Sequence, residues 1–348
     1  MEHYAGIDVS VKSSCVCVVT ASGKIVREAT VESEPEALIG WFRSLGLSFA
    51  RIGLEAGPLS QWLYSALKQA GLAAELLETR RVRKALEIMP IKTDRNDARG
   101  IAQLVRVGLF QPVHCKSVAA QEMRALLTAR KLVQSKLFDV EMSLRGILRG
   151  FGLKVGPTTP RQFSGRIKEL VVGHGTLEVI AQALLPLHEV LLREFGGFEK
   201  RVRAIARSDA RTRLLMSAPG VGAIVALTYA SAIDDPSRFK SSKGVGAHFG
   251  LTPKKYQSGE TEYDGRISKF GDKSVRTALY EAAHIILVRP LKRSGGLKSW
   301  AMRVAKRAGM KKAKVALARK LAVILHRMLA DGTSFMLATA KNPAVAAA

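Results

Sequence analysis

The first 110 residues alternate between strand-like and helical segments in an order that few folds accommodate. Three strands joined by turns are expected first, at residues 4–8, 14–20 and 24–31. The segments that follow alternate between helix and strand: a helix at 35–45, a strand at 50–55, a helix at 61–70, a strand at 72–77 and a helix at 94–107. This β-β-β-α-β-α-β-α order predicts a mixed sheet covered by helices.

The same order is that of the ribonuclease-H-like (RuvC-like) fold. A likeness of fold alone gives no chemistry, so any activity has to be argued from particular side chains.

The middle of the chain predicts a long helical hairpin or coiled coil. Apolar residues recur there at alternating spacings of 3 and 4, and Arg130 fills one slot of the repeat. A Gly/Pro-rich stretch at 150–160 separates the two runs, which are Met123, Leu126, Val133, Leu137, Val140, Leu144 and Ile147, and then Leu184, Leu187, Leu191, Phe195, Phe198, Val202 and Ile205. Such a stripe is typical of a core or of an oligomer contact.

These patterns divide the chain into four parts. Residues 1–118 form the α/β domain, 119–208 the helical hairpin, and 209–335 a mainly helical domain that contains a polar loop around Ser258. Residues 336–348, rich in small side chains, are expected to fray.

The positive charge is concentrated in the second part of the chain. The net charge is +26, of which residues 1–120 contribute +3 and residues 121–348 contribute +23. Residues 291–330 contain 12 Lys and Arg and no Asp or Glu. Such a field attracts polyanions, and its helical pattern without an aromatic insertion face favours nucleic acid over an anionic membrane. We expect no membrane span, no signal peptide and, with three cysteines, no disulfide framework, which fits a cytosolic protein.

Four carboxylates stand where the predicted fold can bring them together. Asp8 and Glu55 end the first and fourth strands, and Asp94 and Asp97 share one face at a helix start. Each has an ordinary alternative reading, such as a helix N-cap for Asp94 or a strand-end turn for Asp8. Gathered together they predict a Mg²⁺ site, because clustered carboxylates need cations and Mg²⁺ prefers oxygen ligands.

Two serines lie among cations further along the chain. Ser258 and Ser268 are surrounded by Lys254, Lys255, Arg266, Lys269 and Lys273. A serine hydroxyl attacks a phosphodiester only if its proton is removed or the developing charge is stabilised, and flanking cations do the second. The alternative is a hydroxyl that only contacts phosphate. We interpret Ser268 in that way, or as a helix cap, and expect His248 and His284 to be structural.

Two further features predict nucleic-acid contacts. The turn at residues 218–222 resembles a helix-hairpin-helix turn, in which Gly220 and Gly222 let backbone amides approach a phosphate, although a plain interhelical turn has the same pattern. The predicted phosphate-binding side chains are Lys254, Lys255, Arg266, Lys269, Lys306, Arg307, Lys311, Lys312, Lys314, Arg319 and Lys320.

Seven short blocks, in order and at similar spacing, resemble one family. They are Gly6-Ile7-Asp8, Leu54-Glu55-Ala56-Gly57, Lys92-Thr93-Asp94 with Asp97-Ala98-Arg99, Pro219-Gly220-Val221-Gly222, Gly250-Leu251-Thr252-Pro253, Tyr256-Gln257-Ser258-Gly259, and Ile267-Ser268-Lys269-Phe270-Gly271-Asp272. The chain resembles bacterial insertion-sequence transposases with a DEDD (RuvC-like) N-terminal domain and a serine-containing C-terminal domain, to which Piv-type DNA invertases are related.

The resemblance implies roles and partners. Asp8, Glu55, Asp94 and Asp97 match the metal-binding acids, and Ser258 matches the serine that becomes linked to DNA. It further implies double-stranded donor and target DNA, a structured guide (bridge) RNA, and a homo-oligomer, dimer to tetramer, assembled through the long helices in the bacterial cytoplasm at the nucleoid.

Two other functions remain open from the residues alone. One is a RuvC-like two-metal Holliday-junction nuclease, in which Ser258 only binds phosphate. The other is a non-enzymatic nucleic-acid-binding assembly protein, against which the four acids argue.

Overall fold

A computed structural model describes residues 1–87, 91–291 and 293–335. The chain divides into two compact units, Met1–Lys116 and Ser117–Ala348, which are described separately. The predicted tail at 336–348 lies outside the described residues.

The N-terminal unit is built on a five-stranded mixed sheet of order β3-β2-β1-β4-β5. β1 pairs antiparallel with β2 and parallel with β4, and its residues 5–7 are buried. The strands are β1 (His3–Val9), β2 (Ser13–Thr20), β3 (Ile25–Glu32), β4 (Phe49–Glu55) and β5 (Ala74–Leu77). The predicted mixed sheet of the ribonuclease-H-like type is therefore confirmed.

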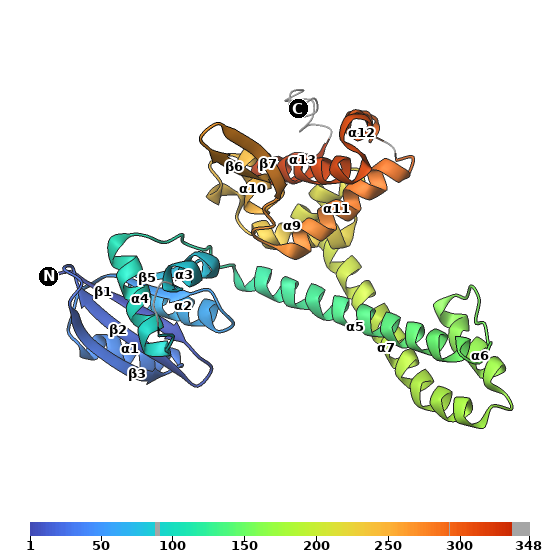
Figure 1. The fold of residues 1–348 in the computed structure, drawn as a ribbon, viewed down its shortest axis with the longest axis horizontal. Coiled ribbons are helices and arrows are strands. Elements are labelled where there is room, and N and C mark those ends of the chain that lie inside the picture. Colours follow the sequence, from blue (N-terminus) through green and yellow to red (C-terminus); the bar gives the residue numbers. More distant parts are fainter. Residues whose placement is uncertain (88–90, 292, 336–348) are drawn as a thin grey trace. The chain divides into compact units, whose positions relative to one another are not determined.

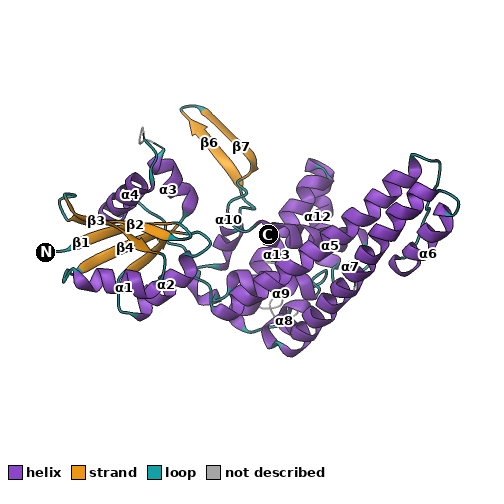
Figure 2. Ribbon diagram, turned by 90° about the horizontal axis from the view of Figure 1, so that it is seen from below, coloured by secondary structure: helices purple, strands orange, loops and turns teal. Residues whose placement is uncertain are grey.

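Helices cover both faces of this sheet (Figure 2). α1 (Pro35–Ser44) and α2 (Ser60–Gln69) bury Leu38, Phe42, Leu63 and Leu67 against one face. α3 (Thr79–Leu86) and α4 (Asp94–Val107) pack on the other. The sequence did not predict α3, because this short helix carries four basic residues and buries only Val82.

α4 lies on β1 with almost no space between the two backbones. A Cβ atom built on Gly6 of β1 would lie 2.3 Å from both the Ala98 carbonyl oxygen and the Ala102 amide nitrogen of α4. Real Cβ atoms do not approach other atoms this closely, so only glycine fits at this position. Gly6 therefore sets how near the start of α4 comes to the end of β1.

The predicted helical hairpin forms the first part of the C-terminal unit. α5 (Val118–Arg149) and α7 (Gly175–Ser208) run antiparallel, and Arg130 in the polar slot of the repeat pairs with Glu199 and lies 5.0 Å from the Phe195 ring centroid. α6 (Pro160–Val171), which the sequence did not predict, packs Phe163 and Ile167 against both helices (Figure 1).

By length and composition alone, an 18-residue window of α7 could cross a membrane. This is weak evidence for a span, because core helices satisfy the same criterion. Part of the apolar composition of α7 is explained by the hairpin core, in which Leu177, Ala181 and Leu185 are buried. The fully buried His188 of α7 lies 3.0 Å from Glu141 of α5.

The rest of the unit is a helical domain with one large core. The Tyr229 hydroxyl, buried in this core, donates to the Ala322 carbonyl oxygen at 2.5 Å and ties two of its helices together. The helices are α8 (Ala210–Met216), α9 (Ala223–Ile233), α10 (Val245–His248), α11 (Lys273–Val288), α12 (Gly295–Ala308) and α13 (Met310–Asp331). The predicted mainly helical C-terminal region is thus present, and the three cysteines are free.

The expected polar loop around Ser258 is a β-hairpin instead. β6 (Pro253–Ser258) pairs antiparallel with β7 (Thr261–Ile267). The prediction of a loop is wrong because every residue of β6 is exposed, so β6 lacks the alternation of apolar and polar residues that indicates a strand. Cross-strand contacts stabilise the hairpin, including a stacked Tyr256–Tyr263 pair with ring centroids 5.0 Å apart.

We expect Gly6→Ala to lower the free energy of unfolding of the N-terminal unit by about 1–3 kcal/mol or more, because the new methyl group forces α4 away from β1. Gly40→Ala is the matched control. A Cβ atom at Gly40 would have open space around it to 4 Å, and alanine is favoured by about 0.5–1 kcal/mol inside a helix. Thermal unfolding followed by circular dichroism measures both, and equal transitions would contradict the role assigned to Gly6.

Candidate active site and nucleic-acid surface

Two of the candidate acids meet at the carboxyl edge of the sheet. β1 and β4 are neighbouring parallel strands, and Ile7 pairs with Leu54. Asp8 and Glu55 each follow that pair by one residue. Since neighbouring strands lie about 4.8 Å apart, the two half-buried carboxylates emerge side by side.

The other two acids lie in the first turn of α4. Thr93 is the N-cap, and its hydroxyl accepts a hydrogen bond from the Asn96 amide at 3.2 Å. The alternative that Asp94 is merely the N-cap is therefore wrong. Asp94 and Asp97 are left with their carboxylates at the helix start, next to the end of β1.

The four acids form one electrostatic cluster. Burial raises the pKa of Asp8 to about 6, with further contributions from the charges of Asp94 and Asp97. Burial also raises the pKa of Glu55, and the charges of Asp8 and Asp97 add to it. Burial is thus the largest cause of both shifts, the neighbouring carboxylate charges add to it, and Lys92 opposes it.

These carboxylates do not form a finished metal cage. Across the described parts of the chain, no group of three or more His, Cys, Asp or Glu side chains is arranged closely enough to hold a metal ion. The donor set, however, consists entirely of carboxylate oxygens with excess negative charge, and this is the chemistry that hard divalent cations prefer.

A network of arginines holds α4 over the sheet. Glu28 of β3 accepts hydrogen bonds from Arg99 Nε at 2.6 Å and from Arg95 Nε at 2.9 Å. The pKa of Glu28 is lowered to about 2 by its hydrogen bonds with Arg99 and Arg95. Because Arg95 and Arg99 alternate in sequence with the two acids, this network orients the turn that carries Asp94 and Asp97.

Sequence reasoning missed the residues that support this cluster. Lys92, Glu28 and Gly6 were not predicted as part of the site. The sequence did carry a signal for Lys92, because it stands two residues before one of the acids in the block Lys92-Thr93-Asp94. Nothing local in the sequence marks Glu28, whose arginine partners lie 67 and 71 residues away.

Ser258 lies at the exposed tip of the β6–β7 hairpin. It pairs with Thr261 across a two-residue turn that begins with Gly259, whose φ of 55° suits the first turn position of this type. Among the described residues, no side chain makes a hydrogen bond to the Ser258 hydroxyl. Its oxygen is exposed and accessible to a large substrate.

Of the neighbouring candidates, Asp272 and His248 have structural roles, and the expectation for His284 stays a prediction. Asp272, and not Ser268, caps α11, since its carboxylate accepts from the Ser274 amide at 2.7 Å. The capping role considered for Ser268 is therefore wrong. His248 contacts the Phe239 and Phe249 rings, and His284 is exposed on α11.

The hairpin is less basic than the sequence pattern indicated. Lys254, Lys255 and Arg266 are matched in number by the acids of the same two strands and their turn, Glu260, Glu262 and Asp264. Lys255 forms an ion pair with Glu262 across the strands. Strand pairing thus sets acids opposite the lysines near Ser258, and the role of the flanking cations stays a prediction.

The glycine turn joins α8 to α9. A Cβ atom on Gly220 would lie 2.8 Å from the Ala282 carbonyl oxygen, so packing against α11 accounts for this glycine. Gly222 is the exposed N-cap residue of α9. A Cβ atom on Gly222 would have open space to 4 Å, so packing does not explain this glycine and its predicted phosphate contact stays a prediction.

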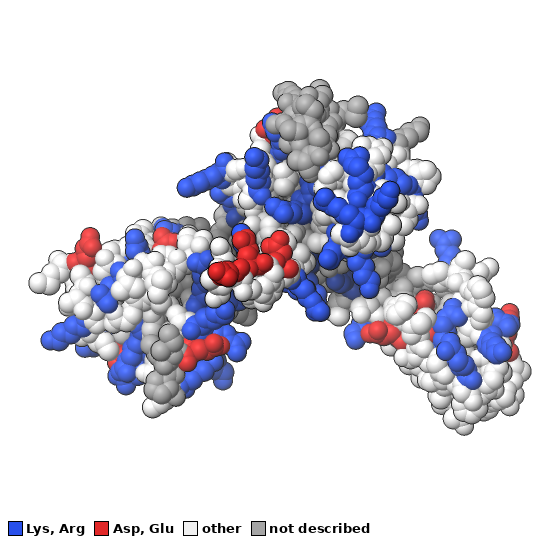
Figure 3. Space-filling model, turned by 45° about the horizontal axis from the view of Figure 1, so that its top comes forward, with Lys and Arg blue, Asp and Glu red and all other residues white. Residues whose placement is uncertain are grey.

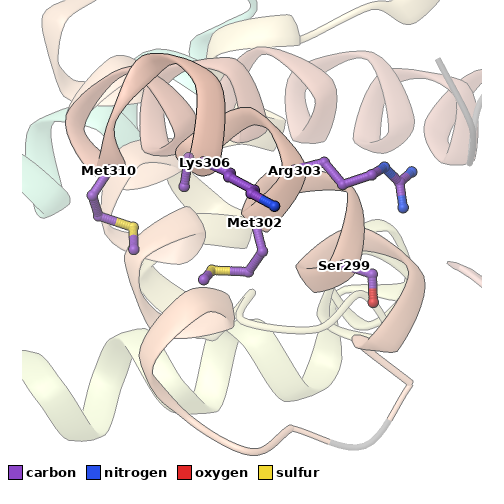
Figure 4. Close-up of a pocket in the computed structure, with 6 residues that line it drawn as sticks. Ser299, Met302, Arg303, Lys306 and Met310 are labelled. Atoms are coloured by element: carbon purple, nitrogen blue, oxygen red, sulfur yellow. The ribbon is translucent and has the colours of Figure 1, made fainter.

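The predicted cations of α12 and α13 lie in three different structural environments. Lys311, Lys312, Arg319 and Lys320 line one groove together with Arg266 and Lys269. Lys314 lies over the Tyr280 ring, 5.8 Å from its centroid. Lys306 lies beside Met302 and Met310 at a shallow recess, whereas Arg303 extends away from it (Figure 4).

Basic side chains therefore gather over the C-terminal helices, as the surface in Figure 3 shows. Arg307 is exposed on α12. Lys254 is exposed on β6. The arrangement suits contacts with a phosphate backbone more than reading of bases.

Comparisons with known families match both units. A family described as "Transposase IS116/IS110/IS902 family" matches residues 212–295. A second, described as "Transposase" and named for the DEDD transposases of the IS110 type, matches residues 5–152. Together they cover about two thirds of the chain.

Individual relatives are similar over most of their length. The transposase for insertion sequence element IS1111A of Coxiella burnetii (strain RSA 493 / Nine Mile phase I) is 28% identical over 93% of this chain and 88% of its own. The transposase for insertion sequence element IS1328 of Yersinia enterocolitica is 24% identical over 82% of this chain and 85% of its own.

Among solved structures, T. thermophilus RuvC in complex with a Holliday junction substrate aligns with 32% of this chain and 100% of its own. The sequence identity is 14% and the TM-score is 0.26.

We expect Glu28→Gln to lower the free energy of unfolding of the N-terminal unit by about 1–2 kcal/mol at pH 7, because two charge-assisted arginine contacts are weakened. The pKa of Glu28 is lower in the folded state than in the unfolded state. Its contribution is therefore complete above about pH 4.5 and lost as the pH falls toward 2.

Denaturant unfolding at several pH values measures this difference. Glu32→Gln, an exposed change at the end of the same strand, is the control and should leave stability within about 0.5 kcal/mol. If the difference in unfolding free energy between wild type and Glu28→Gln were the same at pH 7 and pH 3, the stabilising role of the ionised Glu28 would be contradicted.

Proposed function

Because this chain carries both transposase domains of the IS110/IS116 family and is an insertion-sequence transposase of that family, we propose that it cuts and rejoins DNA strands through a covalent phosphoserine at Ser258. The observation that carries the proposal is the presence, in one chain, of four clustered carboxylates and an exposed serine at a hairpin tip.

In the proposed first step, the Ser258 oxygen attacks the phosphorus of a phosphodiester. A serine–phosphate bond forms and the bond to one sugar oxygen breaks. The serine proton leaves, and the departing sugar oxygen takes up a proton. Attack by a sugar hydroxyl on the phosphoserine reverses this exchange, so that rejoining needs no external energy source.

Asp8, Glu55, Asp94 and Asp97 would hold a divalent cation, with Mg²⁺ as the proposed ion. Their all-oxygen donor set and the raised pKa of Asp8 and Glu55 fit such an ion. Bound there, it would offset charge on the reacting phosphate and favour deprotonation of a coordinated oxygen. Other residues of this chain hold the acids in place. Glu28 orients the start of α4, and Gly6 allows this helix to pack directly against β1.

The proposed partners are double-stranded donor and target DNA and a structured guide (bridge) RNA, the last on family resemblance. The strong positive charge of the C-terminal unit supports polyanion binding. The setting is the cytoplasm of a bacterium, at the nucleoid.

The proposed assembly is a homo-oligomer, dimer to tetramer, in which the acids of one subunit act with Ser258 of another. Large apolar side chains remain exposed along the helical hairpin and support an oligomer contact there. They are Leu132, Phe138 and Met142 of α5 and Val179, Leu187 and Val190 of α7.

The second candidate function is a RuvC-like junction nuclease, favoured because no described side chain forms a hydrogen bond that would activate the Ser258 hydroxyl. In that reaction water attacks the phosphodiester and the product is a plain nick. The third, a nucleic-acid-binding assembly protein without activity, leaves the acid cluster unexplained.

We expect Ser258→Ala to bind its nucleic-acid partners and to form no protein–DNA adduct on a denaturing gel, because the attacking oxygen is missing. Labelled donor and target DNA with guide RNA provide the assay. Ser268→Ala is the matched control and should still form the adduct. If Ser258→Ala still forms the adduct and Ser268→Ala does not, Ser268 is the nucleophile. If both variants nick DNA and neither forms an adduct, the nuclease reaction is favoured.

We expect Asp8→Asn to lower strand cleavage by at least about 100-fold and to change the dissociation constant for DNA by less than about threefold. The substitution keeps the shape of the side chain and removes its charge, whereas binding depends on the cations of α12 and α13. Glu2→Gln, an exposed change near the start of the same strand, is the control. Full cleavage by Asp8→Asn, or in excess chelator, would contradict a catalytic role for the acids.

A further inference from the structure

A groove of about 1290 Å³ lies at the base of the β6–β7 hairpin, away from its serine tip. One face of α13 forms its long wall, and the hairpin base, α12 and residues 241–243 form the others. It exceeds the roughly 300–1,000 Å³ of pockets that hold one small ligand, so it has room for a longer molecule.

The rim of this groove is cationic. Eight Lys and Arg side chains line it, against two acids, Asp264 and Asp331. Asp331 is paired with Arg327 at 3.1 Å. The remaining cations include Lys243, Lys311, Lys312 and Arg319, which leaves a strong excess of positive charge.

The floor of the groove is apolar. It consists of Leu251, Ile267, Trp300, Val315 and Val323. Trp300 and Val315 pack against the main core and are only partly buried. The ammonium of Lys320 lies 4.4 Å from the Trp300 ring centroid, so the indole also fixes one cation at the floor.

A duplex can contact only the cationic rim of the groove, because its bases are stacked inside and its phosphates face outward. Unpaired nucleotides satisfy both surfaces, since their phosphates meet the lysines while their bases cover apolar side chains. We propose that this groove binds an unpaired, single-stranded stretch of nucleic acid. The inference rests on the proposed function and adds a site that the strand-transfer chemistry does not require.

The groove is also separate from the reacting serine. Five residue steps of β6 lead from Pro253 at the groove to Ser258, which at about 3.3 Å per residue is about 17 Å. A strand held in the groove is thus anchored several nucleotides from the phosphate that Ser258 attacks.

The experiment uses Trp300 as the reporter in the full-length chain. Trp41→Phe with Trp62→Phe leaves Trp300 as the single tryptophan. Single-stranded ten-nucleotide DNA, the same sequence as RNA, and the matched duplex are titrated separately. We expect either single strand to quench Trp300 and the duplex to quench it weakly. The stronger of the two single strands identifies the source of the unpaired segment.

Charge variants provide a second measurement that does not depend on the tryptophan changes. By fluorescence anisotropy with labelled oligonucleotides, Lys311→Gln with Lys312→Gln should weaken single-strand binding at least about tenfold and duplex binding by a clearly smaller factor, since a duplex reaches only the rim. Lys200→Gln with Arg201→Gln removes the same charge from exposed positions of α7 and should change neither.

The proposal would be overturned if the groove variant lost affinity for single strand and duplex by the same factor. It would also be overturned if the groove variant bound single strands as tightly as the α7 control variant. The Ser258 adduct, assayed in parallel, separates the two hypotheses. Adduct formation together with unchanged single-strand binding in the groove variant rejects this site alone. Absence of any adduct in the wild-type chain rejects the proposed function.

Discussion

The candidate active site depends on the contact between the backbones of β1 and α4 at Gly6. No side chain separates the strand from the helix there, so the first turn of α4 reaches the end of β1. The four acids come from three elements, β1, β4 and α4, and only this approach makes them one cluster. Burial and like charges at such proximity raise the pKa of Asp8 and Glu55, and the Glu28–arginine network on the far side of α4 holds the helix against that repulsion.

Much of the N-terminal unit could be predicted, because strand and helix order restricts the topology and strand ends indicate which side chains meet. Asp8 and Glu55 followed from that rule, and the pattern of alternating spacings indicated the α5–α7 hairpin. The supporting contacts could not be predicted in this way. Glu28 meets Arg95 and Arg99 only after the sheet has formed, and Gly6 is required by atoms of a helix more than 90 residues later.

The missed elements have different physical causes. β6 buries no residue, so it leaves no alternation of apolar and polar residues in the sequence, and α3 is a helix of eight residues that buries only Val82. The hairpin also shows why composition near a residue is a poor guide to its electrostatic surroundings. The lysines around Ser258 looked like a cationic loop, but pairing sets Glu262 against Lys255, and the uncompensated cations lie instead on α13.

The exposure of the β6–β7 hairpin separates the position of Ser258 from the folding of the helical domain. Within the described part of this hairpin, Ile267 is the side chain that packs against the main core, and the rest of both strands is held by cross-strand pairing. Substitutions along the hairpin therefore cost the helical domain little stability. The length of the two strands, and with it the distance of Ser258 from the helices, can be changed by mutation without unfolding the domain that carries them.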